Sequence, residues 1–294
     1  RVSHPAPPGV VTVLVRGCVR WCIRDGVSGD VDQGREGERR IDTGALWGAW
    51  GADGPDPLRR DGDTLTGAKI FASGLGTVSH ALVTVDSGPE VQLALMETTD
   101  DARADASGWD MPGMRATASG RYDFGGLPLD PAAQLGGPGD YLAEPHFVGG
   151  VWRIAALQAG AALGLLNAAA AQLRAADRLD AEAQKSRLMT VVMQVWAGMA
   201  LVERAACAAV GEHPPERIVA TSIAARLQTE QTALAAIAAV EQSPGLRHFA
   251  PGSVTHRMAR DLSVYTRQAA RDAFWQRAAD SALAESGDIW GVFQ

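Results

Sequence analysis

The sequence contains 294 residues, of which 46% are hydrophobic and 21% charged, the composition of an ordinary globular protein with a sizeable core. Its formal net charge of −7 argues against nucleic acid as the main partner, because a phosphate-binding surface needs clustered lysine and arginine. The 3 cysteines, Cys18, Cys22 and Cys207, cannot all pair, so we expect free thiols in a reducing, cytoplasmic compartment.

Residues 1–44 are predicted to form an irregular N-terminal segment. Pro5, Pro7 and Pro8 exclude an early helix, and the stretch at 25–40 is rich in glycine and charge, which is typical of a solvated loop. The apolar run at 10–15 is too short for a secretory signal and is followed by arginine and tryptophan. The 6 histidines of the chain are scattered without metal-ligand spacing, so no metal site is predicted.

Residues 45–145 predict a small antiparallel β-domain, because short β-rich runs alternate with clusters of Gly, Pro and Asp. In the central stretch, 62–86, β-rich runs at 64–71 and 80–85 flank the small-residue turn 72–76. The alternation in ALVTV and the Gly/Ser cluster before it predict a hairpin whose loop brings backbone close to another group. A purely structural turn is the default interpretation, since glycine more often solves a backbone problem than binds a ligand.

Residues 146–294 predict an antiparallel four-helix bundle, with helices at about 150–176, 181–210, 214–243 and 253–286. The apolar run at 155–173 approaches membrane length. Gln158, Asn167 and Gln172 interrupt it, and alanine contributes little transfer energy, so we expect a buried bundle helix and no membrane span.

Several motifs occur in an order that is typical of one family. LTGAKIFASG at 65–74 precedes ALVTV at 81–85, MPGMRATAS at 111–119 and LGGPGD at 135–140, and FVGGVWR at 147–153 then opens the helical region. The closing RDLSVYTRQ at 260–268 is similar to the ending of a divergent bacterial branch. Together these motifs, which span roughly residues 45–285, resemble the acyl-CoA dehydrogenase superfamily.

The resemblance implies an α+β fold, a β-domain followed by a helical bundle, that holds FAD between its two parts. It also implies an oxidoreductase that abstracts a proton from the α carbon of an acyl thioester, such as an acyl-CoA, while hydride passes from the β carbon to the flavin. A homodimer or homotetramer and an electron-transfer partner are expected from the same resemblance.

The resemblance also identifies candidate cofactor contacts. The matching positions are Trp50 and Asp53 on the pyrimidine side of the flavin, Phe71, Ala72 and Ser73 against its ring, and Arg267 or Gln268 in the bundle.

The sequence departs from the family at the catalytic base, commonly a glutamate in a Tyr-Glu-Gly-Thr segment, because YTRQ stands there at 265–268. Asp261 and Asp272 are the nearest carboxylates; we expect Asp261 in an ion-paired cap, and Asp272 is the candidate base. The family's Arg-x-x-Phe-Gly segment is also missing, and residues 1–44 lack the helical period of its N-terminal domain, so most of that domain is expected to be absent.

These departures leave two alternatives to a dehydrogenase. One is a non-catalytic relative that keeps the fold as an oligomeric scaffold or binding protein. The other is a relative of the flavin-dependent monooxygenases, which would need no carboxylate base.

Overall fold

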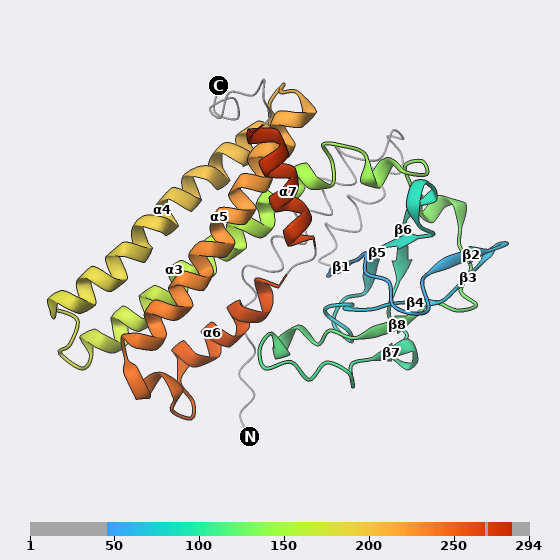
Figure 1. Ribbon diagram of the computed structural model, residues 1–294. Helices are drawn as coiled ribbons and strands as arrows, with labels where there is room; N and C mark the ends of the chain where they lie inside the picture. The colour runs from blue at the N-terminus through green and yellow to red at the C-terminus, as the bar shows by residue number, and fades with distance from the viewer. Residues whose placement is uncertain (1–45, 268–269, 284–294) are drawn as a thin grey trace. The chain divides into compact units, whose positions relative to one another are not determined.

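The computed structural model describes residues 46–267 and 270–283, so the predictions for residues 1–44 and for Gln268 lie outside the described part of the chain (Figure 1). The described chain divides into two compact units. The β unit comprises residues 46–110 and 115–146, and the helical unit comprises residues 111–114 together with the chain from Phe147 onward.

The β unit is built from three small sheets. The largest has the order β1-β5-β6-β9, formed by Trp47–Trp50, His80–Val85, Gln92–Glu97 and Gln134–Leu135. The second has the order β4-β8-β7, formed by Ala68–Lys69, Arg121–Asp123 and Ala104–Asp105. A separate hairpin pairs β2 and β3, formed by Arg59–Asp61 and Thr64–Thr66.

The prediction of a hairpin between runs 64–71 and 80–85 is wrong. The first run contributes β3 and β4 to two different sheets, whereas the second is β5 of the largest sheet. The turn between them bonds to another part of the chain: Ala72 N donates to Gly120 O at 2.9 Å, and Gly74 N to Thr117 O at 2.7 Å. Alternation identifies an extended run but carries no information about which strand pairs with it.

The prediction of a purely antiparallel β-domain is also incorrect, because β1 pairs with β5 in parallel, with Trp47 opposite His80 and Trp50 opposite Val83. Parallel neighbours need a long crossover connection. Here residues 51–79 form that connection, and they include β2, β3 and β4 of the other two sheets.

The core of the β unit is aromatic and aliphatic. Trp50 packs against Tyr122 at 5.6 Å between ring centroids, and Tyr122 packs against Phe124 at 4.9 Å. The aliphatic members of this cluster include Leu58, Leu65, Ala81, Val83, Val85, Ala94 and Leu129.

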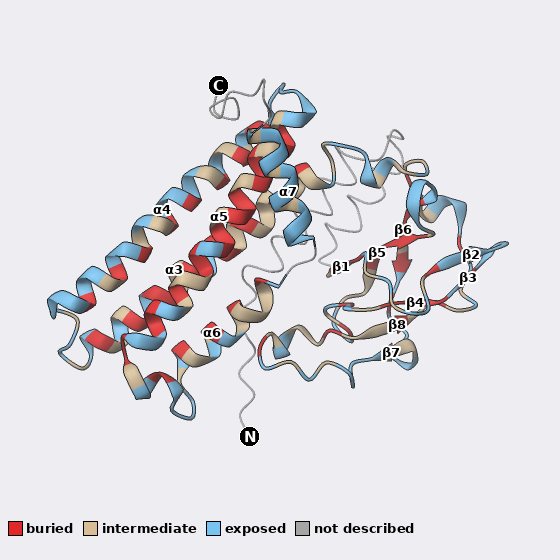
Figure 2. Ribbon diagram, viewed as in Figure 1, coloured by how far each residue is buried: buried red, intermediate tan, exposed pale blue. Residues whose placement is uncertain are grey.

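The helical unit contains three long helices, α3 (Trp152–Arg174), α4 (Glu182–Val210) and α5 (Pro215–Gln242). They lie side by side in Figure 1 and cover the first three predicted helices. Buried residues are concentrated on α5, which packs against both α3 and α4 (Figure 2). The main apolar cluster joins these helices to α6 through small and branched residues that include Ala162, Leu165, Leu166, Val191, Val195, Ala236, Val240 and Leu262.

The fourth predicted helix is divided in two, so the described chain has five α-helices and the prediction of four is wrong. α6 (Val254–Tyr265) ends where the Thr266 hydroxyl donates to Ser263 O at 2.9 Å. α7 (Arg271–Ala282) begins after Ala270, whose φ of 64° is left-handed and incompatible with a continuous α-helix. The α+β class itself is confirmed.

By length and composition alone, residues 148–174 and α4 are each apolar enough to cross a membrane. Core helices of globular proteins meet the same criterion, which makes this weak evidence for a span. In α3 the residues on the inner face, from Ala155 to Leu173, are buried against the other helices of the unit.

Candidate functional site

The turn after β4 presents two side chains outward and one inward. Phe71 has a left-handed φ of 52° and is 58% exposed, and its ring packs edge-on with that of Trp109 at 6.4 Å between ring centroids. Ala72 is fully buried, and its backbone N–H and C=O are both bonded to Gly120. Ser73 is exposed, and its hydroxyl lies 2.7 Å from the hydroxyl of Ser119. A non-glycine residue at positive φ is uncommon and is found disproportionately at functional sites.

Trp50 contacts the backbone of this turn from the buried side. Its side chain is 3% exposed, and its indole N–H donates to Ser73 O at 3.1 Å. The ring is therefore packed in the core, and the role of Trp50 is to hold the backbone of the turn.

Asp53 belongs to a polar cluster that sequence reasoning missed. Its carboxylate oxygen Oδ1 accepts from Lys69 Nζ at 2.5 Å and from Leu58 N at 3.2 Å. The Lys69 ammonium also donates to the Thr84 hydroxyl at 2.8 Å. The side chain of Lys69 is fully buried, whereas that of Asp53 is 30% exposed. A buried charge is not visible in sequence, since lysine is ordinarily a surface residue.

The bundle residues assigned to the cofactor or to catalysis lie at the junction of α6 and α7. Arg267 is exposed one residue beyond the C-cap of α6. Asp272 is 90% exposed and forms an ion pair of 3.0 Å with Arg271. Asp261 accepts a hydrogen bond of 2.7 Å from Met114 N and lies 3.8 Å from Arg257, so this carboxylate is engaged in structural contacts.

Residues 111–114 are tightly packed on α6. A Cβ atom at Gly113 would lie 2.2 Å from the carbonyl oxygen of Arg260, closer than real contacts allow. Only glycine therefore fits there, and together with the Met114 N–H bond to Asp261 it fixes this segment to the helix.

A second feature that sequence reasoning missed is a buried polar network in the helical unit. Glu230 on α5 is 1% exposed and accepts from Arg226 Nη1 at 2.8 Å and from Arg271 Nε at 2.7 Å. Gln158 on α3 accepts from the same Arg226 nitrogen at 3.2 Å and from the Thr229 hydroxyl at 3.0 Å. The hydrogen bonds to Glu230, followed by those to Asp272, raise the pKa of Arg271.

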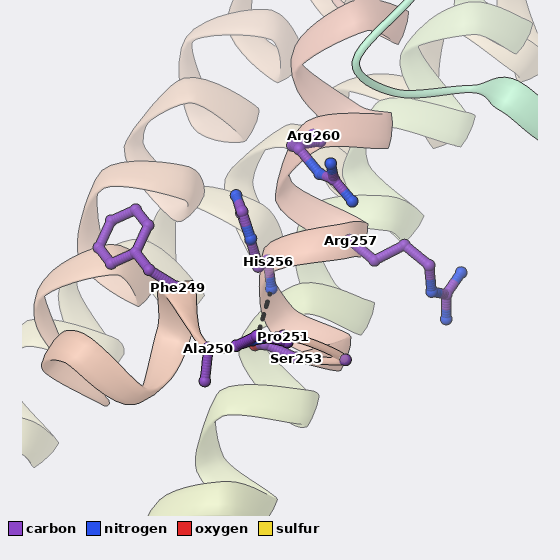
Figure 3. A pocket seen from close by; sticks show the side chains of 8 residues that line it. Phe249, Ala250, Pro251, Ser253, His256, Arg257 and Arg260 are labelled. Atoms are coloured by element: carbon purple, nitrogen blue, oxygen red, sulfur yellow. Dashed lines mark hydrogen bonds between the residues drawn. The ribbon is translucent and has the colours of Figure 1, made fainter.

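A basic pocket of about 350 Å³ lies at the start of α6. Figure 3 shows Arg257 and Arg260 extending on one side, Phe249 on the other, and His256 between them. Ser253 caps the helix by accepting from His256 N at 3.2 Å. Positive side chains beside a helix N-terminus favour an anionic group. The pocket is lined by Phe249, Ala250, Pro251, Gly252, Ser253, His256, Arg257 and Arg260.

Within residues 46–267 and 270–283, no three His, Cys, Asp or Glu side chains are grouped so that they could hold a metal ion.

No protein-family model matches the sequence, and no curated protein matches it. Solved structures do match it. FMN-bound TdsC from Paenibacillus sp. A11-2 superposes with a TM-score of 0.75 and 18% identity, over 93% of this chain and 79% of that one. Butyryl-CoA dehydrogenase from Megasphaera elsdenii gives a TM-score of 0.77 and 17% identity, over 93% and 77%. Nitroalkane oxidase with 1-nitrooctane gives 0.78 and 13%, over 96% and 78%.

These similar structures share the acyl-CoA dehydrogenase fold, and the present chain has the same fold over most of its length. The resemblance inferred from the motifs is thereby confirmed at the level of fold. TdsC is described as a dibenzothiophene monooxygenase, and nitroalkane oxidase as a flavoprotein, so one architecture serves several redox reactions.

Proposed function

We propose that this protein is a flavin-dependent oxidoreductase. The observation that carries the proposal is the fold, shared with FMN-bound TdsC, with the flavoprotein nitroalkane oxidase and with butyryl-CoA dehydrogenase. A bound flavin would supply hydride or electron transfer, which side chains alone cannot provide.

The residues of the β unit fit a flavin ring in part. Phe71 and Ser73 are exposed on the turn, where an aromatic face and a hydroxyl are available to a planar ligand. Asp53 is partly exposed and offers a carboxylate oxygen to the N–H group of a pyrimidine edge. Trp50 and Ala72 fit as backbone support only, because their side chains are buried and both backbone hydrogen-bonding groups of Ala72 are used internally.

The basic pocket of the helical unit fits an anionic group, and we propose that it binds one. Arg257 and Arg260 supply the charge, and Arg267 is a further exposed cation just beyond the C-terminus of α6. FAD is the cofactor that the sequence resemblance implies, whereas TdsC was solved with FMN, so mass spectrometry of the released cofactor is the deciding measurement.

Two reactions remain within this proposal. Dehydrogenation of an acyl thioester, with electrons passed to a partner protein, requires a carboxylate base. Asp272, the candidate base, is exposed and paired with Arg271, and Asp261 is bonded to Met114 N. Because neither Asp272 nor Asp261 has the shielded setting of a base, this observation favours the second reaction, oxygen-dependent monooxygenation, which needs none.

We also propose that the protein self-associates through α4, as a homodimer or homotetramer in the cytoplasm. Four large apolar side chains of this helix are exposed at three- and four-residue spacing, which places them on one face. Such a contiguous apolar face is typical of a protein–protein interface. The four are Met189, Met193, Trp196 and Met199.

The test of function begins with the purified protein and its cofactor. Anaerobic bleaching of the flavin by an acyl-CoA panel would support dehydrogenation, whereas oxygen consumption with externally reduced flavin would support monooxygenation. Phe71→Ala is expected to lower flavin occupancy, with Leu142→Ala as a control at another exposed apolar side chain of the same unit. Full retention of flavin by Phe71→Ala would contradict the placement of the ring, and a protein that binds no flavin would support the scaffold alternative.

A further inference from the structure

The chain contains two lysines, and both are paired with aspartate in opposite surroundings. Lys69 is fully buried with Asp53 at 2.5 Å, whereas Lys185 is 60% exposed with Asp180 at 2.8 Å. An exposed pair such as the second contributes little to stability, typically about 0–1 kcal/mol. The first is the unusual one, because burying an ammonium group is costly.

The Lys69 ammonium closes a set of hydrogen bonds that involves every residue of the segment 51–53. It donates to Asp53 Oδ1 and to the Thr84 hydroxyl, and Thr84 in turn donates to Gly51 O at 3.3 Å. Between these two contacts, Ile70 N donates to Ala52 O at 3.0 Å. The segment is therefore held at three consecutive residues, by Lys69 of β4, by Ile70 directly after it and by Thr84 of β5.

Burial of the Lys69 ammonium costs desolvation free energy, so the ion pair is a poor means of stabilising the fold. Burial lowers the pKa of Lys69 below its usual 10.5, and the hydrogen bond and charge of Asp53 only oppose that effect. Replacing a buried ion pair with apolar residues of similar volume is often neutral or stabilising. A charged side chain at this position is therefore better explained by the geometry that it imposes on its partners.

We propose that Lys69 is a positioning residue, which holds segment 51–53 so that Asp53 presents its second carboxylate oxygen to an N–H donor of a bound ligand. Oδ1 of Asp53 is occupied by Lys69 and Leu58 N, and the described residues supply no hydrogen bond to Oδ2. Under the proposed function, on which this inference rests, the donor is the imide N–H of the flavin pyrimidine edge.

The set of hydrogen bonds by which Lys69 holds segment 51–53, here called the clamp, is testable without any flavin. The test compares the chemical reactivity of Lys69 with that of Lys185. Acetylation by an amine-reactive ester, followed by peptide mass spectrometry, should label Lys185 rapidly and Lys69 at least about tenfold more slowly, since reaction of Lys69 requires local opening. Thr84→Val removes one contact of the ammonium and should accelerate labelling of Lys69 while that of Lys185 stays unchanged. Equal labelling rates of the two lysines in the wild type would overturn the clamp.

The positioning role is tested by flavin titration of Lys69→Met, with Lys185→Met as the matched control. Loss of a hydrogen bond to a charged group corresponds to roughly ten- to hundredfold weaker binding. We expect that loss in Lys69→Met, with an altered visible absorption spectrum of bound flavin and a urea midpoint of the flavin-free protein close to wild type. Lys185→Met should match wild type in flavin affinity, absorption spectrum and urea midpoint. Thr84→Val, which keeps the ion pair, should show a smaller loss in the same direction and serves if Lys69→Met does not fold.

Wild-type affinity and spectrum in Lys69→Met would overturn the positioning role. A large fall in its urea midpoint, with an unchanged spectrum of whatever flavin still binds, would show a structural role instead and would overturn it too. Wild-type protein that binds no flavin would overturn the proposed function and with it the contact to the ligand, whereas the labelling rates would still decide whether the clamp exists.

Discussion

The buried carboxylate of Glu230 allows a sharp prediction, because Glu230→Gln keeps the shape of the side chain and removes only its charge. Glu230 is 1% exposed and is the acceptor for Arg226, whose side chain is 2% exposed. Its second partner, Arg271, is 43% exposed and can return to water. The substitution therefore leaves one guanidinium buried without a counter-charge.

The expected loss of stability follows from this difference in exposure between Arg226 and Arg271. Breaking a buried ion pair by removing one partner typically costs about 3–5 kcal/mol, whereas the half-exposed contact to Arg271 adds at most about 1 kcal/mol. We take about 3 kcal/mol as the expected loss, since a glutamine oxygen retains one hydrogen bond. In a domain of this size each kcal/mol lowers the Tm by about 2–4 °C, so the helical unit should melt about 6–12 °C earlier.

The assay is thermal unfolding followed by far-ultraviolet circular dichroism, which is dominated by the helical unit. Asp272→Asn is the control, because that carboxylate is 90% exposed and its loss should change stability by less than about 0.5 kcal/mol. The double variant Arg226→Leu with Glu230→Leu should be less destabilised than Glu230→Gln, since it leaves no buried charge. A Glu230→Gln protein that melts within about 2 °C of wild type would refute the reasoning.

Three further predictions concern other parts of the helical unit. Gly113→Ala should destabilise by about 1–3 kcal/mol, because its Cβ would lie 2.2 Å from Arg260 O, and unchanged urea unfolding would contradict that packing. Burial, and then the charge of His256, lower the pKa of His248 below 6.5, so the unfolded chain binds more protons and stability is lost as the pH falls below about 6.5. His248→Asn should flatten this dependence when Tm is measured from pH 5 to 7.5; an equally steep profile would exclude His248 as its source. Trp196→Glu should shift the protein toward monomer in light scattering, and an unchanged mass would exclude this face of α4 as the interface.

The long helices could be predicted from the sequence because apolar residues recur with the period of a helix over many turns. On α4 the pattern correctly places Leu188, Val191, Val195 and Val202 in the core, but it also predicts Met199 there, and that side chain is exposed. The break between α6 and α7 could not be predicted, since Ala270 is a good helix former that adopts a left-handed conformation only in its tertiary context.

The candidate site was likewise predictable from the sequence only in part. The turn at 72–76 was found from its small residues, and Ser73 in it and Phe71 directly before it are exposed. Whether Trp50 faces a ligand or the core could not be read from the sequence, because either environment suits an indole ring. Lys69 and Glu230 were missed altogether, since a buried charge is recognised only from the partners that the fold brings to it, such as Thr84 and Arg226.

The central claim, that this chain is a flavoprotein, is tested most directly by the ultraviolet–visible spectrum of the freshly purified protein, with mass spectrometry of the chromophore released by heat. We expect flavin absorption bands with one FAD or FMN per chain, either as purified or after incubation with excess cofactor. A colourless protein that takes up neither flavin would contradict the account and leave a fold without its redox chemistry.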